Sequence, residues 1–160
     1  MEQIWDSLLH FGAEPALVIV SMIPFIELRG GIILGAALGV NWALTLVLCT
    51  LGNIIPVPFL IVFGRYVMEL LERTKLFGRW VRGYKRRLMG KSGTIQKYGP
   101  WGLVLFVGIP LPGTGAWSGA LLAVLLGLRM KAAVPAILLG VLLGGVVMTL
   151  GTQGIIGIFQ

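Results

Sequence analysis

Three long stretches of this chain contain no charged residue, and their lengths constrain the fold more than any other feature. They cover residues 30–64, 98–128 and 132–160. A straight α-helix needs about 20 apolar residues to cross the hydrocarbon core of a bilayer. With 57% apolar and 12% charged residues, the chain has more apolar surface than one small soluble core can bury. The sequence therefore predicts an all-α integral membrane protein of one domain, residues 1–160, and excludes a soluble enzyme.

The first stretch is too long for one transmembrane span and too short for two spans with a turn. Its natural break is Gly39-Val40-Asn41, which leaves residues 42–64 as a predicted transmembrane helix. The preceding residues 15–39 are apolar enough to span, but their middle contains helix breakers and charges: Pro24, Glu27, Arg29, Gly30 and Gly31. Charged groups are costly at the bilayer centre, and proline interrupts a helix. We therefore expect residues 15–39 to form a re-entrant hairpin.

The second half of the chain repeats this order of elements. The breakers that interrupt residues 98–128 are Pro110, Pro112, Gly113 and Gly115. A short break follows at residues 127–129, and residues 132–152 form the second predicted transmembrane helix. Aligning Pro24 with Pro110 places Gly39 opposite Gly127 after a two-residue slip. The pattern predicts two repeats, each a re-entrant hairpin followed by a transmembrane helix.

The distribution of charge sets the orientation of these elements. The net charge is +7, and ten of the 13 Lys and Arg residues lie between residues 65 and 97. The positive-inside rule places segment 65–97, Arg129 and Lys131 in the cytoplasm. Both ends of hairpin 98–128 then lie inside, whereas hairpin 15–39 enters from outside, so that the repeats have inverted topology. Residues 1–14 carry no Lys or Arg and are expected to be external.

Segment 65–97 joins the two repeats and has the pattern of an amphipathic helix. Aromatic and aliphatic residues recur at helical spacing among cations, which is typical of a helix on an anionic membrane surface. The residues expected to bind that surface are Arg79, Trp80, Arg82, Lys85, Arg86 and Arg87. This placement favours membrane lipids over nucleic acid as the partner of the basic segment.

Glu27 and Arg29 are the strongest candidates for function, because ionisable residues within apolar segments are paired, water-exposed or functional. Glu27 is expected to accept protons or contact cations, and Arg29 to bind an anionic headgroup. A structural ion pair between them is the alternative. Backbone N–H groups at the broken helices would also bind anions. The other residues expected to contact substrate or protons are Gly30, Gly31, Asn53, Thr114 and Trp117, with Pro56 as a further helix breaker. No metal-ligand cluster, nucleophile–base pair or cofactor motif is present.

Several of these motifs resemble a known family. They are residues 24–31, Gly52-Asn53 followed by Pro56, and residues 109–117. They are similar to the putative small multidrug export family, within the wider DedA/VTT superfamily. The resemblance implies paired inverted re-entrant hairpins and roles linked to lipid scrambling, undecaprenyl-phosphate recycling or proton-dependent drug tolerance. DedA-type proteins carry arginines around the proline of the second hairpin, whereas residues 110–117 contain none. Arg29 alone therefore remains to bind an anion.

The leading hypothesis is a small transporter or flippase in the inner (cytoplasmic) membrane of a prokaryote. Its substrate would be an amphiphile with an anionic headgroup, such as a polyprenyl phosphate or phospholipid, moved at a midplane site with Glu27 coupled to protons. The alternatives are proton-coupled efflux of lipophilic cations and a non-transporting membrane scaffold. An enzyme is not expected, because a single acid with no His or nucleophile nearby does not form a usual catalytic site. A homodimer is expected, since it would shield the hairpins from lipid.

Overall fold

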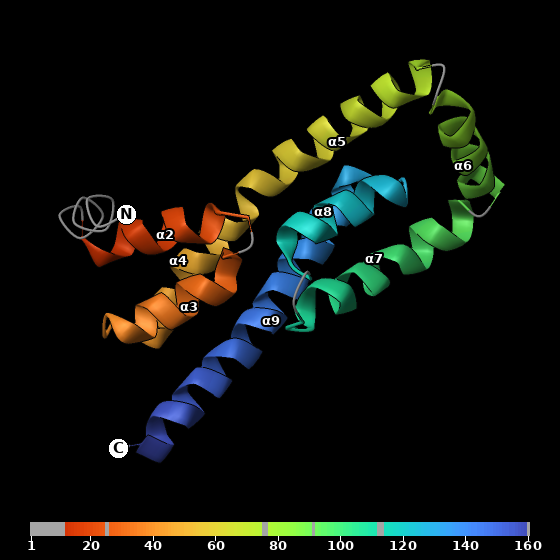
Figure 1. Cartoon of the computed structure of the whole chain (residues 1–160). Coiled ribbons are helices and arrows are strands. Elements are labelled where there is room, and N and C mark those ends of the chain that lie inside the picture. Colours follow the sequence, from red (N-terminus) through yellow and green to blue (C-terminus); the bar gives the residue numbers. More distant parts are fainter. Residues whose placement is uncertain (1–11, 25, 75–76, 91, 112–113, 160) are drawn as a thin grey trace.

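The computed structural model describes residues 12–24, 26–74, 77–90, 92–111 and 114–159, and this part of the chain is helical (Figure 1). In chain order the elements are α2 (Ala13–Met22), α3 (Glu27–Ala37), α4 (Trp42–Ile54), α5 (Pro56–Arg73), α6 (Gly78–Gly90), α7 (Ser92–Gly108), α8 (Ala116–Leu125) and α9 (Met130–Phe159). The described residues contain no strand. The predicted all-α class is therefore confirmed for them.

The helices form two groups that pack against each other. In the first group α2 and α3 pack together and against α4, which leads into α5. In the second group α7 and α8 pack together and against α9. Helix α9 contacts α3 and α4, and α5 lies along α8, as Figure 1 shows. Helix α6 links the groups, packs against α5 and α7, and is bonded to the end of α8 through Tyr84.

Helices α3 and α8 end in the same way, at the two glycines that the sequence alignment placed opposite each other. Gly39 has φ 70° and Gly127 has φ 63°, a left-handed conformation that glycine adopts without strain. Val40 N–H donates to the Gly35 carbonyl at 2.9 Å, and Leu128 N–H donates to the Ala123 carbonyl at 3.0 Å. These bonds are the six-to-one bonds of a Schellman motif. Each motif turns the chain from a short helix into a long one.

Glycines at aligned positions allow neighbouring helices to approach closely in both groups. A Cβ atom at Gly52 of α4 would collide with the Val18 carbonyl of α2, and one at Gly140 of α9 would crowd the Val104 carbonyl of α7. Likewise, Gly31 of α3 approaches Ser21 and Cys49, whereas Gly119 of α8 approaches Val107 and lies near Ile137. Glycine permits such close approach of helix backbones. The second group thus repeats contacts of the first, with partners that match the alignment and its two-residue slip.

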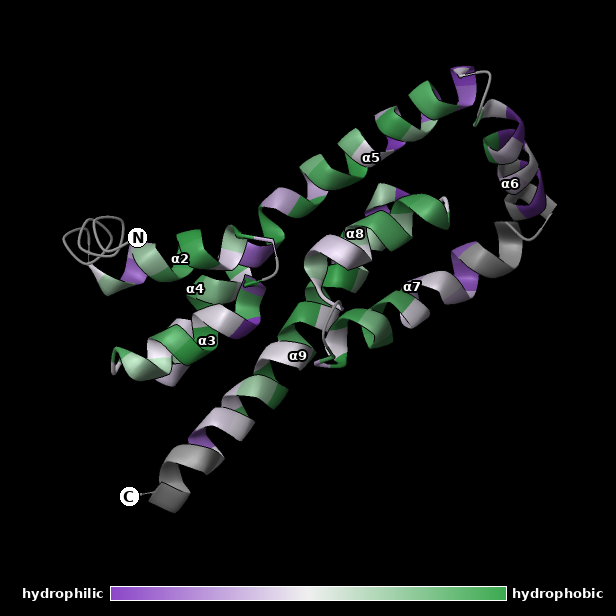
Figure 2. Ribbon diagram, in the orientation of Figure 1, coloured by the Kyte–Doolittle hydropathy of each residue, from purple (hydrophilic) through white to green (hydrophobic). Residues whose placement is uncertain are grey.

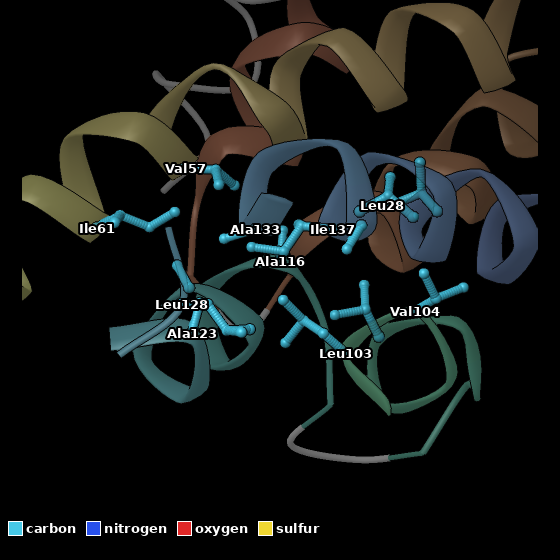
Figure 3. Close-up of a cluster of buried hydrophobic side chains, with 14 of the residues drawn as sticks. Leu28, Val57, Ile61, Leu103, Val104, Ala116, Ala123, Leu128, Ala133 and Ile137 are labelled. Atoms are coloured by element: carbon cyan, nitrogen blue, oxygen red, sulfur yellow. The ribbon is translucent and has the colours of Figure 1, made fainter. Parts of the chain in front are cut away.

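The apolar core lies where the two groups meet (Figure 3). Val57 and Ile61 of α5 are fully buried there against α8 and α9, and Leu28 of α3 reaches the same cluster. Small residues such as Ala116 and Ala123 on α8 let the helices pack closely. This core fixes α3 and α8, the two helices whose first turns carry the site described below.

The outer surface of the molecule is apolar. Phe59 is 74% exposed and Leu150 is 68% exposed, and Figure 2 shows hydrophobic residues along α4, α5, α8 and α9. A water-soluble monomer rarely exposes so continuous an apolar surface. Two helical segments are long and apolar enough to cross a bilayer, Trp42–Arg73 and Met130–Gly154. The protein is therefore a membrane protein with candidate transmembrane helices.

These segments are longer than the spans predicted at 42–64 and 132–152. The first consists of α4 and α5, which meet at Ile55, and Pro56 begins α5 at a position where its missing N–H costs no helical bond. Helix α5 continues through charged residues to Arg73. The predicted hairpin segments 15–39 and 98–128 correspond to α2–α3 and α7–α8, which begin earlier, at Ala13 and Ser92. Most of the predicted external segment 1–14 lies outside the described residues.

Candidate functional site

Glu27 begins α3 in an unusual backbone conformation. Its φ is 51°, and it is the one residue other than glycine with positive φ in the described part of the chain. A non-glycine residue in this region is strained, and such strain concentrates at functional sites. The side chain is buried, with 8% exposed. The sharp entry into α3 thus directs a carboxylate into the interior, toward the second group of helices.

The carboxylate of Glu27 binds the first turn of α8. Its Oε1 atom accepts a hydrogen bond from the Trp117 backbone N–H at 3.2 Å. The first four N–H groups of a helix lack helical partners and carry partial positive charge, so an acid is stabilised there. Gly115, the N-cap of α8, lies against the same carboxylate, and a Cβ atom at this position would collide with it. A glycine at this position therefore allows the acid to approach.

Arg29 binds the segment between α7 and α8. Its guanidinium donates to the Leu111 carbonyl, to the Thr114 carbonyl at 2.6 Å and to Thr114 Oγ1 at 2.8 Å. A longer bond of 3.4 Å reaches the Ile109 carbonyl, just past the C-terminus of α7. Carbonyls at a helix C-terminus carry partial negative charge and attract a cation. Arg29 thus contacts the end of α7, while Glu27 contacts the start of α8.

Glu27 and Arg29 each bind backbone groups of the segment that contains α7 and α8. A structural ion pair between the two residues stays an alternative. Together they join the turn between α2 and α3 to the turn between α7 and α8.

Asn53 lies beside this contact, on α4. Its side chain is 2% exposed, and its Oδ1 atom has no hydrogen-bond partner in the structure. Asn53, Glu27, Arg29 and Gly115 line a cavity of about 10 Å³. A buried amide oxygen without a partner is costly, and the cavity that Asn53 lines is close to the size that holds one water molecule.

A large apolar groove lies on the other side of Trp117. It has a volume of about 890 Å³ and is lined by Trp117 and by one face of α5, which contributes Pro56, Pro58, Phe59, Leu60, Val62, Phe63 and Tyr66. Trp117 therefore belongs to two features. Its backbone N–H binds Glu27, and its side chain forms a wall of the groove.

In a comparison with protein-family models, residues 27–147 match the model described as putative small multi-drug export protein. This range covers most of the chain and contains Glu27, Arg29, Asn53 and Trp117. The chain belongs to this family. Searches of curated proteins and of solved structures gave no match. The family description indicates a transport protein of the membrane.

The other residues predicted for the site lie in turns or pack against neighbouring helices. A Cβ atom at Gly30 would collide with Ile26, and Gly31 packs between α2 and α4. Pro24 and Pro110 lie in the turns after α2 and α7. Pro112 and Gly113 lie outside the described residues.

The cationic residues predicted to bind the membrane surface lie on α6, whose side chains are described in part. Arg79, Arg82, Arg86 and Arg87 are exposed, as is Trp80. Trp80 stacks on Tyr84 with ring centroids 5.7 Å apart, and Val81 is buried. Lys85 belongs to α6, but its side chain is not described. Helix α6 is therefore amphipathic, with Val81 facing the protein.

Sequence analysis missed a group of residues at the far end of α8. Arg65 donates to the Leu128 carbonyl at 2.6 Å, Tyr84 Oη donates to the Leu125 carbonyl at 2.7 Å, and Gln96 Nε2 donates to the Gly127 carbonyl at 2.9 Å. These bonds satisfy carbonyls that the end of α8 leaves without helical partners. The many charged residues beyond residue 65 were the only indication of this group in the sequence. They do not show which backbone carbonyls accept the hydrogen bonds. Among the described residues, no group of three His, Cys, Asp or Glu side chains is placed to hold a metal ion.

Proposed function

We propose that this protein is a small secondary transporter that exports lipophilic cations from the bilayer, with the contact between the two hairpins as its moving part. The observation that carries the proposal is the double role of Trp117. A substrate in the groove touches the indole, and the same residue's N–H holds Glu27. Occupancy of the groove and the state of Glu27 are thereby coupled through one residue.

The chemistry of the groove supports a lipophilic substrate. Its lining residues are apolar or aromatic, and no Lys, Arg, Asp or Glu is among them. The rings of Trp117, Tyr66, Phe59 and Phe63 offer faces that attract organic cations. Arg29 is engaged with carbonyl oxygens of the opposite hairpin, so in this conformation its donors are directed to backbone rather than to an anionic ligand. The description of the family as multi-drug export agrees with this substrate class.

Glu27 is proposed as the group that couples transport to protons. Ionised, it is stabilised by the first turn of α8; protonated, it loses most of this attraction, because the partial charge of a helix terminus acts on charge. Proton binding would therefore release Trp117 and loosen the contact between the hairpins. The cavity beside Asn53 would supply the water through which a proton reaches the carboxylate.

The proposed membrane arrangement is a pair of inverted repeats, as in many secondary transporters. Hairpins α2–α3 and α7–α8 would enter the bilayer from opposite sides and meet at Glu27 and Trp117. The matching Schellman motifs and the matching close approaches at Gly52 and Gly140 support the repeat. The basic α6 would lie on the cytoplasmic surface of a prokaryotic inner membrane. A second copy would cover the exposed apolar faces, and placement in the DedA/VTT superfamily belongs to the same proposal.

A second candidate function is translocation of a lipid with an anionic headgroup. The observation that favours it is the exposed position of the Arg29 bonds to the Leu111 and Ile109 carbonyls. Separation of the hairpins would free these donors for a phosphate group, which a guanidinium binds in a bidentate manner.

The test is transport in proteoliposomes with an imposed pH gradient, using tetraphenylphosphonium as the cation and a fluorescent phosphatidylglycerol as the lipid. Glu27→Gln is expected to reduce cation transport at least tenfold, whereas Glu14→Gln, an exposed acid on α2, should leave it unchanged. Movement of the lipid alone, lost in Arg29→Gln, would favour the second candidate. If the wild type moves neither compound, the transport proposal fails and a scaffold role is favoured.

A further inference from the structure

A second pocket lies at the end of α8 away from Trp117. It has a volume of about 350 Å³ and contains residues of α5, α6, α8 and the turn before α9. Its polar lining residues are Arg65 and Glu69 of α5, Tyr84 of α6 and Arg129 between α8 and α9. Two arginines that are distant in the sequence thus line one pocket, together with a single acid.

Arg65 is held through one side-chain bond and Arg129 through its backbone, so guanidinium N–H donors of both residues remain for a ligand. The bond from Arg65 to the Leu128 carbonyl uses one of the five N–H donors of a guanidinium. The backbone of Arg129 is held at both ends: its N–H donates to Gln96 Oε1 at 3.4 Å, and its carbonyl accepts from Ala132 and Ala133 in the first turn of α9. The Arg129 side chain is exposed at the pocket. Planar guanidinium groups in such positions suit the oxygens of a phosphate group.

The rest of the pocket is apolar. Met68, Val124, Leu125 and Met130 contribute to its lining. Glu69 lies three residues after Tyr66 on α5, and residues at this spacing share a helix face. Tyr66 lines the apolar groove, so the same face of α5 runs from the pocket toward that groove. A ligand that fits both parts has a negatively charged group and an apolar tail.

The position of the pocket agrees with this ligand. The exposed arginines of α6 follow α5 directly in the chain, and Tyr84 of that helix forms a wall of the pocket. A cluster of cations next to a transmembrane segment lies at the cytoplasmic surface, where anionic lipids are concentrated. The two arginines outnumber Glu69, so the pocket has a net positive charge.

We propose that this pocket binds the phosphate group of an anionic phospholipid, with its acyl chains along α5. The bound lipid joins α5, α6 and the segment from the end of α8 to the start of α9, which the bonds of Arg65 and Tyr84 also connect. It is a structural lipid rather than the transported compound, because the pocket lies at the opposite end of α8 from the Glu27–Trp117 contact. The inference does not depend on the proposed transport function.

The test is calorimetric binding of short-chain (dihexanoyl) phosphatidylglycerol to the purified protein in a neutral detergent. Phosphatidylcholine of the same chain length is the headgroup control. We expect Arg65→Ala and Arg129→Ala each to weaken binding of phosphatidylglycerol about tenfold, as expected for loss of a charge-assisted hydrogen bond. Glu69→Gln should strengthen binding, because it removes a like charge. The control Arg73→Ala changes an exposed arginine at the end of the same helix and should have no effect.

Several outcomes would overturn the proposal. Equal binding of both lipids would show that the charged pocket is not involved. An equal loss with Arg73→Ala would show adsorption to basic surface in general. Displacement of the lipid by an equal concentration of inorganic phosphate would identify a free phosphate site without a role for the acyl chains. Arg129→Lys retains the charge and should therefore lose less binding than Arg129→Ala. If both variants lose binding equally, the loss reflects damage to the fold rather than loss of charge in the pocket.

Discussion

The carboxylate of Glu27 accepts a hydrogen bond from the Trp117 backbone N–H, so an acid of the first group of helices holds the first turn of a helix in the second. The alignment that pairs Gly39 with Gly127 also pairs Glu27 with Gly115 and Arg29 with Trp117. The aligned positions in the second group of helices therefore carry a glycine and a tryptophan in place of the two charged residues. A second acid at position 115 would repel the first, and any side chain there would collide with it. The glycine at position 115 thus permits the contact with Glu27.

Gly115→Ala is expected to disrupt this contact directly. A Cβ atom at Gly115 meets the Glu27 carboxylate, and forced overpacking of this kind costs about 1–3 kcal/mol. We expect a lower melting temperature in detergent, followed by circular dichroism. Gly102→Ala is the matched control, because a Cβ atom there meets nothing within 4 Å and alanine stabilises a helix relative to glycine by about 1 kcal/mol. Equal stability of the two variants would contradict the observed approach of Glu27 to α8.

Arg29→Lys tests whether the guanidinium is needed for its several acceptors. Lysine retains the charge but not the planar fork, so it cannot reach the Leu111 carbonyl and Thr114 together in the same geometry. Each charge-assisted bond contributes about 1.5–3 kcal/mol, and loss of one should lower the melting temperature measurably. Arg73→Lys, at an exposed position on α5, should have no effect. If both variants behave as the wild type, the bonds of Arg29 do not stabilise the fold.

The position of the site was predictable because its residues violate the apolar pattern. Glu27 and Arg29 are the charged residues of an otherwise apolar segment, and Pro24, Pro110 and Gly115 interrupt helices nearby. Their partners were not predictable, because a backbone N–H at Trp117 or a carbonyl at Leu111 has no signature in the sequence. The interpretation of Arg29 as an anion site stays a prediction, since here it binds carbonyl oxygens instead.

The helices were predicted better than their ends. The predicted span 42–64 ended before the charge of Arg65 and the span 132–152 began after Lys131, but α5 continues to Arg73 and α9 reaches Phe159. Helical hydrogen bonds do not require apolar side chains, and so a helix can leave the bilayer before it ends. The ends of α3 and α8 were marked by Gly39 and Gly127, because a left-handed cap favours glycine. Local backbone requirements were therefore visible in the sequence, whereas helix length was not.

The proposed repeat makes a prediction about two glycines at aligned positions. Gly52→Ala and Gly140→Ala are each expected to destabilise the protein by about 1–3 kcal/mol, because both glycines approach the carbonyl of a neighbouring helix, at Val18 and Val104. Gly151→Ala on α9 meets nothing within 4 Å and should be neutral or stabilising. Denaturant titrations in detergent measure the three effects. A large effect at only one of the two aligned positions would mean that the packing of the groups is not equivalent.

The inverted arrangement predicts which residues a membrane-impermeant thiol reagent reaches. Single cysteines at residues 10, 85 and 130, in a Cys49→Ala background, should be labelled from the outside, the inside and the inside, respectively. The decisive position is Met130, the first residue of α9. If α7 and α8 form a hairpin that enters and leaves on one side, residues 85 and 130 share the cytoplasmic surface with the cations around them. If instead α7 and α8 together made a single crossing of the bilayer, residue 130 would be labelled from outside. That result would remove the re-entrant hairpin, and with it the proposal that Glu27 and Trp117 meet where two such hairpins enter from opposite sides.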